Sequence, residues 1–574
     1  MSGGREAKRL AIRQILSIDN SDIDDDQINE EESESTHSDD ESGTDEESRT
    51  NVDANNDEGH DITEQTWSGM RWRRFLRPIR HTIPDNLFDP PPEELSPIAY
   101  FKQFLGDDAI DILVDETNRY SVEKCGHSIN VTRHEMWKYI AITMTMGIVK
   151  LPTMRMYWNP SYRIGIIADT MGLNRFETIK RYFHINNNEN YVPRGDENHD
   201  PLFKVRPLLD YIRNKCREVQ PEKRQCVDEQ MTKFKGRSVL RRYMPRKPIK
   251  WGIKVIARCG ESGFIHDFHI DGDNLECPQD GSLGYTGDVV MLLCKTLPNE
   301  IFYLYMDRFY TSFPLMSKLA SQNIFTIGTI MPNRLRKCPI KPDKELQKRG
   351  EYDHVVDANS NISVVKWRDN RPVLVTSNFA AVEPMSTCKR YSKERKQRID
   401  VQCPAIIKEY SAHMGGVDLF DMLKGLYNID RRGYKNYTRI CHYLFGVCVI
   451  NGWIIYRRHC KQKGVNSSDM LKFLGSICET LRNQPENQRP RGRPSNDDHG
   501  RVDETTSSKR RCVSYKPTEE IRTDRTQPHF PTHTNRGRCR FCQTGHTTLM
   551  CQTCKMRLCL TKEKNCFTDY HAPL

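Results

Sequence analysis

The chain has 574 residues, of which 37% are hydrophobic and 29% are charged. This length leaves room for several domains. The most apolar stretch, residues 440–456, is 17 residues long, which is shorter than the ~20 that a membrane span needs. We therefore expect a buried helix there and no membrane partner.

The first 17 residues are charged and lack a long apolar core, so we expect no signal peptide and a reducing compartment. In such a compartment the 20 cysteines are better suited to bind metal than to form disulfides.

The net charge of +10 is unevenly distributed along the chain. Residues 19–61 hold 19 acidic residues and one basic residue, so this leader carries −18 and the remainder carries +28. We expect the leader to be disordered, as a solubilising tail or as a shield against non-specific DNA. A remainder this basic favours a polyanionic partner, above all nucleic acid.

A basic patch at residues 71–80 follows the leader and is interleaved with Trp72 and Phe75. It could grip phosphates or be only the edge of the first fold. After the prolines at 90–92, apolar residues recur at three- and four-residue spacing. This pattern predicts helices over 100–113, 136–149, 176–183 and 202–216. A helical scaffold of this kind fits contacts with DNA or with a second subunit, and it fits plain packing equally well.

A mixed sheet flanked by helices is predicted from residue 225 onward. Strands are expected over 227–234, 250–257, 264–270, 301–306 and 324–330, and helices over 289–297, 313–321, 404–414, 417–426 and 436–460. The near-continuous apolar run at 301–306 is typical of a strand that is buried on both faces. Residues 331–398 are rich in Lys and Arg, with short strands near 362–367 and 372–376, and we interpret them as an insertion.

Three aspartates interrupt apolar stretches in the order strand, strand, helix. They are Asp228, Asp307 and Asp418. A carboxylate at the end of a buried strand is costly to desolvate unless a positive charge lies beside it. In a basic protein that suits nucleic acid, three such residues indicate a divalent metal site for phosphodiester chemistry. Each one alone fits a strand end or a helix cap. Asp421 lies one helical turn after Asp418 and could face the same site.

The last 36 residues contain two Cys-x2-Cys pairs, which suit tetrahedral zinc because each short loop directs two thiolates at one ion. The candidate zinc ligands are Cys539, Cys542, Cys551, Cys554, Cys559, Cys566 and His571, with His546 as an eighth. Eight ligands would hold two ions in an interleaved arrangement. One ion on the two pairs, with Cys559 and Cys566 as spectators, is the simpler alternative. A segment so poor in large apolar residues could hardly fold without metal.

Two further basic segments are candidates for contact with DNA. Residues 430–435 include Arg431, Arg432 and Lys435, which could contact a backbone phosphate or simply lie in a solvated helix entry. The Pro- and Arg-rich segment 484–534 contains Arg489, Arg491, Gly492 and Arg493. This string resembles an AT-hook, in which arginines enter a narrow A·T minor groove. Basic linkers also produce such strings by chance.

These motifs together resemble the piggyBac family of DNA transposases, and the resemblance covers nearly the whole chain. It rests on the sequences at 227–230 and 234–237, on Asp307 followed by Phe-Tyr-Thr-Ser at 309–312, and on His413-Met-Gly-Gly-Val-Asp418 with Asp421. The cysteine-rich tail, ending at 566–571, matches as well. One departure is Arg308, which stands where the family usually has Asn.

The resemblance implies an α/β protein with a ribonuclease H-like catalytic core, an insertion, a helical dimerisation and DNA-binding domain and a C-terminal zinc module. The expected boundaries are a leader at 1–85, helical segments at 86–221 and 427–483, core segments at 222–330 and 399–426, an insertion at 331–398, a linker at 484–534 and the zinc module at 535–574. Asp228, Asp307 and Asp418 would bind two Mg²⁺ or Mn²⁺ ions, and Asp421 would match a further family carboxylate.

By the same likeness, the protein would be a nuclear homodimer that binds the terminal inverted repeats of a transposon. It would cut and paste double-stranded DNA at TTAA targets through hairpinned ends, with no small-molecule substrate. The alternative is a domesticated, non-catalytic DNA-binding or chromatin protein on the same fold. A ubiquitin ligase based on the tail would leave the aspartates unexplained.

Overall fold

The computed structural model describes residues 70–74, 82–245, 247–274, 282–335, 337–392, 395–429, 435–483, 519–524, 526–542, 545–561 and 563–572. The chain forms two compact units, one within Met1–Asn487 and one within Gln488–Leu574. The acidic leader, Arg431, Arg432 and the AT-hook-like residues Arg489, Arg491, Gly492 and Arg493 lie outside the described residues.

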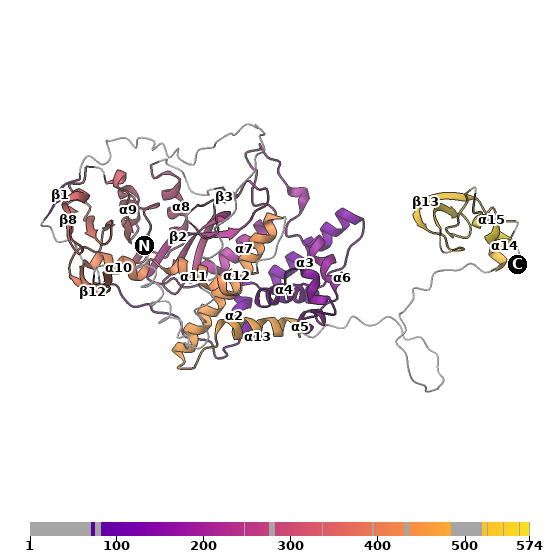
Figure 1. Cartoon of the computed structure of the whole chain (residues 1–574), viewed down its shortest axis with the longest axis horizontal. Coiled ribbons are helices and arrows are strands. Elements are labelled where there is room, and N and C mark those ends of the chain that lie inside the picture. Colours follow the sequence, from indigo (N-terminus) through magenta and orange to yellow (C-terminus); the bar gives the residue numbers. More distant parts are fainter. Residues whose placement is uncertain are drawn as a thin grey trace. The chain divides into compact units, whose positions relative to one another are not determined.

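Helices from both ends of the large unit pack against each other. They are α2 (Pro97–Phe104), α3 (Asp107–Cys125), α4 (Arg133–Ile148), α5 (Gly165–Ala168), α6 (Leu173–Tyr182), α7 (Arg206–Arg217), α12 (Asn436–Gln462) and α13 (Met470–Arg482). In Figure 1 the indigo helix α2 lies beside the orange α12 and α13, and α4 lies beside α13. Gly452 of α12 permits this packing, because a Cβ there would lie 3.1 Å from the Tyr100 carbonyl oxygen of α2.

The single helix predicted over 100–113 is wrong, because the chain breaks between α2 and α3. Gly106 is the N-cap residue of α3. A Cβ at Gly106 would lie 2.5 Å from the Asp108 carboxylate and 2.8 Å from the Tyr211 hydroxyl. The break is therefore fixed by a tertiary contact with α7, which apolar periodicity does not report.

The predicted mixed sheet is confirmed. It contains β1 (Trp72–Arg73), β2 (Arg224–Lys233), β3 (Arg241–Tyr243), β4 (Trp251–Gly260), β5 (Ile265–Ile270), β6 (Phe302–Met306), β7 (Ile324–Thr329), β8 (Tyr352–Asp357), β9 (Ser363–Arg368) and β10 (Pro372–Ser377). Their order is β1-β8-β9-β10-β7-β6-β2-β4-β3, and β5 also pairs with β4. The pairs β2–β6 and β6–β7 are parallel, and the other pairs are antiparallel.

Helices cover both faces of this sheet. One face carries α8 (Gly284–Cys294) and α9 (Phe313–Ala320), whose apolar side chains form a cluster with Val227, Leu304 and Met306. The other face carries α10 (Ala405–His413), α11 (Gly416–Leu426) and the start of α12. Within residues 331–398, interpreted above as an insertion, β8, β9 and β10 extend the main sheet, and β11 (Ser386–Ser392) pairs with β12 (Gln397–Cys403) as a separate hairpin.

By length and composition α12 could cross a membrane, but 83% of its apolar window is buried inside the protein. The small unit contains α14 (Glu519–Thr523), β13 (Pro531–Arg538), β14 (His546–Cys551) and α15 (Cys566–His571). Its described core consists mainly of cysteines, together with Met556, Leu558, Phe567 and Tyr570. Without a metal ion this core is small for a folded unit.

Candidate active site and metal centres

Asp228 and Asp307 lie at the ends of two neighbouring parallel strands. The β2–β6 register pairs Val227 with Met306, so each aspartate is one residue beyond that pair. Adjacent strands are ~4.8 Å apart, and residues in register point to the same face. The backbone therefore places the two carboxylates side by side, on the face that α11 covers.

The start of α11 brings Asp418 to this same face. Gly416 contacts two strands so closely that a Cβ would lie 2.4 Å from the Gly260 carbonyl oxygen of β4 and 2.8 Å from the Cys226 sulfur of β2. Asp418 is the third residue of the helix, two residues after Gly416. Only glycine permits this approach. The Gly-Gly-Val-Asp sequence therefore positions its aspartate against the strand that carries Asp228.

The Tyr410 hydroxyl of α10 reports that the three aspartates converge. Burial raises its pKa first of all, and the charges of Asp307, Asp228 and Asp418 each raise it further. Tyr410 also hydrogen-bonds Thr329, whose hydroxyl donates to Asp307 Oδ1 at 2.8 Å. The hydroxyls of Tyr410 in α10 and Thr329 in β7 thus orient the Asp307 carboxylate.

Among the residues that the structure describes, the sets of three or more ligand atoms within 4.8 Å of one another do not include the aspartates. Such a short mutual distance is the signature of ligands around a single ion. Three carboxylates shared between two ions ~3.5–4 Å apart spread over a wider space. Within the described residues, the structure therefore does not gather the three carboxylates around a single ion.

The electrostatics of the site call for a cation. Burial raises the pKa of Asp228 well above its usual value, and the charges of Glu229 and Asp418 raise it further. Lys247 opposes this effect. Its ammonium lies 3.0 Å from the Glu229 carbonyl oxygen and 3.5 Å from the Glu229 carboxylate. Lys247 and Lys254 both act on Glu229, but two positive charges do not balance four carboxylates, so divalent ions would lower the free energy of the ionised cluster.

Asp421 forms an ion pair with a lysine of its own helix. Its carboxylate accepts a hydrogen bond from Lys424 Nζ at 2.6 Å. Lys424 also lies 5.5 Å from the centre of the Tyr443 ring.

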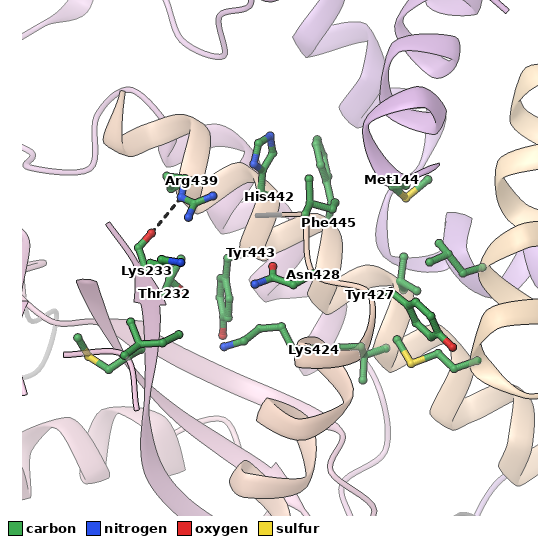
Figure 2. A pocket seen from close by; sticks show the side chains of 18 residues that line it. Met144, Thr232, Lys233, Lys424, Tyr427, Asn428, Arg439, His442, Tyr443 and Phe445 are labelled. Atoms are coloured by element: carbon green, nitrogen blue, oxygen red, sulfur yellow. Dashed lines mark hydrogen bonds between the residues drawn. The ribbon is translucent and has the colours of Figure 1, made fainter. Parts of the chain in front are cut away.

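Lys424 and Tyr443 line a cavity of about 50 Å³ between β2, α11 and α12. Figure 2 shows the Lys424 side chain directed at Tyr443, with Arg439 donating to the Lys233 carbonyl.

Sequence reasoning missed several residues that support the acidic site. They are Glu229, Lys247, Thr329 and Tyr410. Glu229 accepts a hydrogen bond from the Tyr310 hydroxyl at 3.2 Å, and the other contacts are given above. Thr329 ends β7, which runs parallel to β6, so Thr329 lies next to the end of β6 that carries Asp307. Knowledge of the strand order would therefore have identified Thr329 as a site residue. Lys435, one of the predicted DNA contacts, is exposed at the N-cap of α12.

The small unit brings its cysteines and histidines into two groups of four. One group is Cys539, Cys542, Cys559 and Cys566, and the other is His529, Cys551, Cys554 and His571. Within each group the ligand atoms lie within 4.8 Å of one another, as tetrahedral zinc requires. The two Cys-x2-Cys pairs belong to different groups, so the geometry contradicts a single ion shared between them and matches the interleaved arrangement.

His529 takes the position that was predicted for His546. Its Nδ1 lies 3.4 Å from both the Cys551 and the Cys554 sulfurs, whereas His546 starts β14 opposite Arg538 and belongs to neither group. The other histidine, His571, directs Nε2 at Cys554 and Nδ1 at the Phe567 carbonyl oxygen, 2.7 Å away. A carbonyl partner on one ring nitrogen fixes the other as a metal ligand. The eight donors fit two zinc ions.

Comparison with known proteins identifies the class. A sequence model of the transposase family described as Transposase IS4 matches residues 96–453, which is more than half of the chain and includes all three aspartates. The chain therefore belongs to this transposase family. Several of the proteins that it resembles are piggyBac transposases or piggyBac-derived proteins.

Two human proteins are among the similar sequences. PiggyBac transposable element-derived protein 2 is 29% identical over 395 residues, which is 67% of this chain and 65% of that protein. PiggyBac transposable element-derived protein 3 is 29% identical over 412 residues, which is 70% of this chain and 67% of that protein. Among solved structures, the fold resembles a piggyBac transposase from a cryo-EM synaptic complex with hairpin DNA, with a TM-score of 0.58 and 19% identity over 81% of this chain and 97% of that one.

Proposed function

We propose that the protein is a cut-and-paste DNA transposase that cleaves and joins phosphodiester bonds with two divalent metal ions. The observation that carries this proposal is the placement of Asp228 and Asp307 side by side at the ends of β2 and β6, with Asp418 brought to the same face by α11. Oxygen ligands from three separate elements suit Mg²⁺ or Mn²⁺, because they leave coordination positions open for a substrate phosphate.

The sheet supports a ribonuclease H-like core within the larger fold. Strands β5, β4, β2, β6 and β7 are adjacent in that order. The first three are antiparallel, and β6 and β7 continue in parallel with β2. In this topology the carboxylates fall at the ends of the central strands and on a helix that covers one face.

Each residue of the site has a role that follows from its contacts. Asp228, Asp307 and Asp418 would hold the ions, and the Thr329 hydroxyl fixes the orientation of Asp307. Lys247, beside Glu229, balances charge when the site is empty and could contact a phosphate when DNA is bound. Bound Mg²⁺ or Mn²⁺ would lower the pKa of a water molecule or a 3′-hydroxyl and stabilise the leaving oxygen.

The partners and location follow from the same proposal. We infer double-stranded DNA with terminal inverted repeats as the substrate, TTAA as the target, a homodimer as the active form and the nucleus as the compartment. The two groups of four ligands in the small unit would each hold a zinc ion. The solved relative was captured with hairpin DNA, which supports DNA as the substrate class.

The test is excision of a marked element flanked by TTAA and by the inverted repeats found beside the coding region. The wild-type protein should excise it in the presence of Mg²⁺ or Mn²⁺, and Asp228→Asn should abolish excision without weakening DNA binding. Asp400→Asn serves as the control, because Asp400 is an exposed carboxylate of the β11–β12 hairpin and should retain full excision. DNA binding without any divalent-dependent cleavage would refute the proposal and favour the domesticated DNA-binding protein.

A further inference from the structure

Two large aromatic side chains stand exposed at the end of the β3–β4 ribbon. Tyr243 is 50% exposed and Trp251 is 41% exposed. They are direct partners across the two strands, and their ring centres are 4.7 Å apart. Exposed aromatic surface is costly in water and commonly marks an interaction site. Val239, at 54% exposure, adds apolar surface shortly before β3.

The surroundings of this aromatic pair are strongly basic. Between Lys233 and Trp251 the sequence contains seven Lys or Arg residues and no acidic residue. The Arg241 guanidinium lies 4.5 Å from the centre of the Trp251 ring. Lys235 and Lys250 are exposed nearby in the chain. Aromatic rings that offer a stacking surface inside a basic segment are typical of sites for unpaired nucleotides.

The register of the sheet places the pair on the same face as the metal-binding aspartates. Asp228 is opposite Ala257 in β4, and Trp251 precedes Ala257 by an even number of residues, so both side chains point to the face of α11. The separation along β4 is about 20 Å at 3.4 Å per residue. That length corresponds to about six stacked nucleotides.

The loop that follows Tyr243 returns to the catalytic strand. Lys247 in this loop contacts Glu229, the residue after Asp228. The charges of Asp228, Glu229, Asp418 and Asp421 each raise the pKa of Lys247, against the effect of its burial. Lys247 thus links the segment that carries the aromatic pair to the acidic cluster.

Resting on the proposed function, we propose that Trp251 and Tyr243 form a stacking platform for an unpaired base of the DNA strand that is cut or joined at the acidic site. The platform holds a nucleotide within about six positions of the scissile phosphate. It positions the strand and takes no part in the chemistry. Arg241 holds the indole in place and contributes positive charge beside the bound base.

The test uses the full-length protein with Ca²⁺ in place of Mg²⁺ and two DNA probes. One probe is a blunt duplex, and the other is the same duplex with a six-nucleotide single-stranded tail that carries 2-aminopurine at one position at a time. Wild-type protein should bind the tailed DNA more tightly than the blunt DNA and should quench 2-aminopurine at one or two positions. Trp251→Ala should abolish the quenching and weaken tailed binding about 5- to 150-fold, leaving blunt binding unchanged.

Two variants serve as controls. Trp251→Phe should restore most of the quenching, because it keeps an aromatic face. Tyr391→Ala removes an equally exposed ring, at 56%, from the β11–β12 hairpin and should behave as wild type. Thermal unfolding of each variant checks that the fold is kept.

The outcomes separate this inference from the proposed function. Tight duplex binding by the wild type, with no preference for the tail or with quenching that survives Trp251→Ala, overturns the platform and leaves the transposase proposal intact. A change in self-association on light scattering without a change in DNA binding would make the pair a protein contact and also overturns the platform. If the wild type binds neither probe, both proposals fail.

Discussion

Replacing Gly416 with alanine tests how the fold positions the acidic site. A Cβ at this residue would lie 2.4 Å from the Gly260 carbonyl oxygen and 2.8 Å from the Cys226 sulfur. The Gly260 oxygen is a backbone atom that no side-chain rotation can move, so α11 itself must move away from β4. Overpacking of this kind costs about 1–3 kcal/mol. Because Asp418 lies two residues further along the helix, a shift on the order of 1 Å would displace it as well and lower cleavage about 100-fold.

Gly415 supplies the matched control, since it precedes Gly416 in the same motif. A Cβ at Gly415 meets no atom within 4 Å, and its φ of −83° is open to any residue. Gly415→Ala should therefore change the free energy of unfolding by less than about 1 kcal/mol, the cost of alanine at an N-cap. Urea unfolding of both variants, followed by Mn²⁺-dependent cleavage, gives the comparison. Equal destabilisation by the two substitutions would refute the packing argument.

Three further predictions follow from local contacts. The protein should bind two zinc ions per chain, as measured by metal analysis of the purified protein. His529→Ala should release one of the two ions, and His546→Ala should release neither. The opposite result would restore His546 as the ligand. Thr329→Val removes the hydrogen bond to Asp307 and should weaken Mn²⁺ binding about 10- to 100-fold in calorimetry, whereas an unchanged affinity would show that this bond is dispensable. Burial, and then the charges of Arg258 and Arg458, lower the pKa of His266 well below 6.5. Stability should therefore be lost as pH falls below 6.5, and His266→Gln should remove up to about 1.4 kcal/mol of that loss per pH unit; identical pH profiles would contradict a neutral buried imidazole.

The sequence predicts those parts of the core in which burial follows chain periodicity. The strand expected over 301–306 is β6 (Phe302–Met306), the strand over 324–330 is β7 (Ile324–Thr329), and the helix over 313–321 is α9 (Phe313–Ala320). Strands buried on both faces have an unbroken apolar pattern, so the sequence shows clearly where each strand begins and ends. The adjacency of Asp228 and Asp307 then follows from the parallel register, which the sequence does not contain.

Contacts between residues that are far apart in the chain could not be predicted from the sequence. Asp421, grouped with the acidic site because it lies one helical turn from Asp418, also pairs with Lys424 in its own helix, and its place in the acidic site stays a prediction. His529 lies ten residues before Cys539, outside the spacing that suggests a knuckle. It reaches Cys551 and Cys554 because it lies two residues before β13, whose first residue, Pro531, pairs with Cys551. The pairing of β13 with β14 therefore decides which histidine lies beside Cys551 and Cys554.

Arg308 bears on whether the site can bind metal, because it stands beside Asp307 where the family pattern has Asn. Its side chain is exposed, and among the described carboxylates it forms no ion pair, not even with Asp307. Only its backbone N–H, which any residue would provide, donates to Asp307 Oδ1, at 2.6 Å. A guanidinium bound to Asp307 would compete with Mg²⁺ for the carboxylate. A guanidinium turned to solvent leaves that carboxylate free and adds a phosphate-binding charge at the rim of the site. The geometry therefore shows no block by Arg308 to metal ligation at Asp307, and under the proposed function its exposed charge would contact DNA.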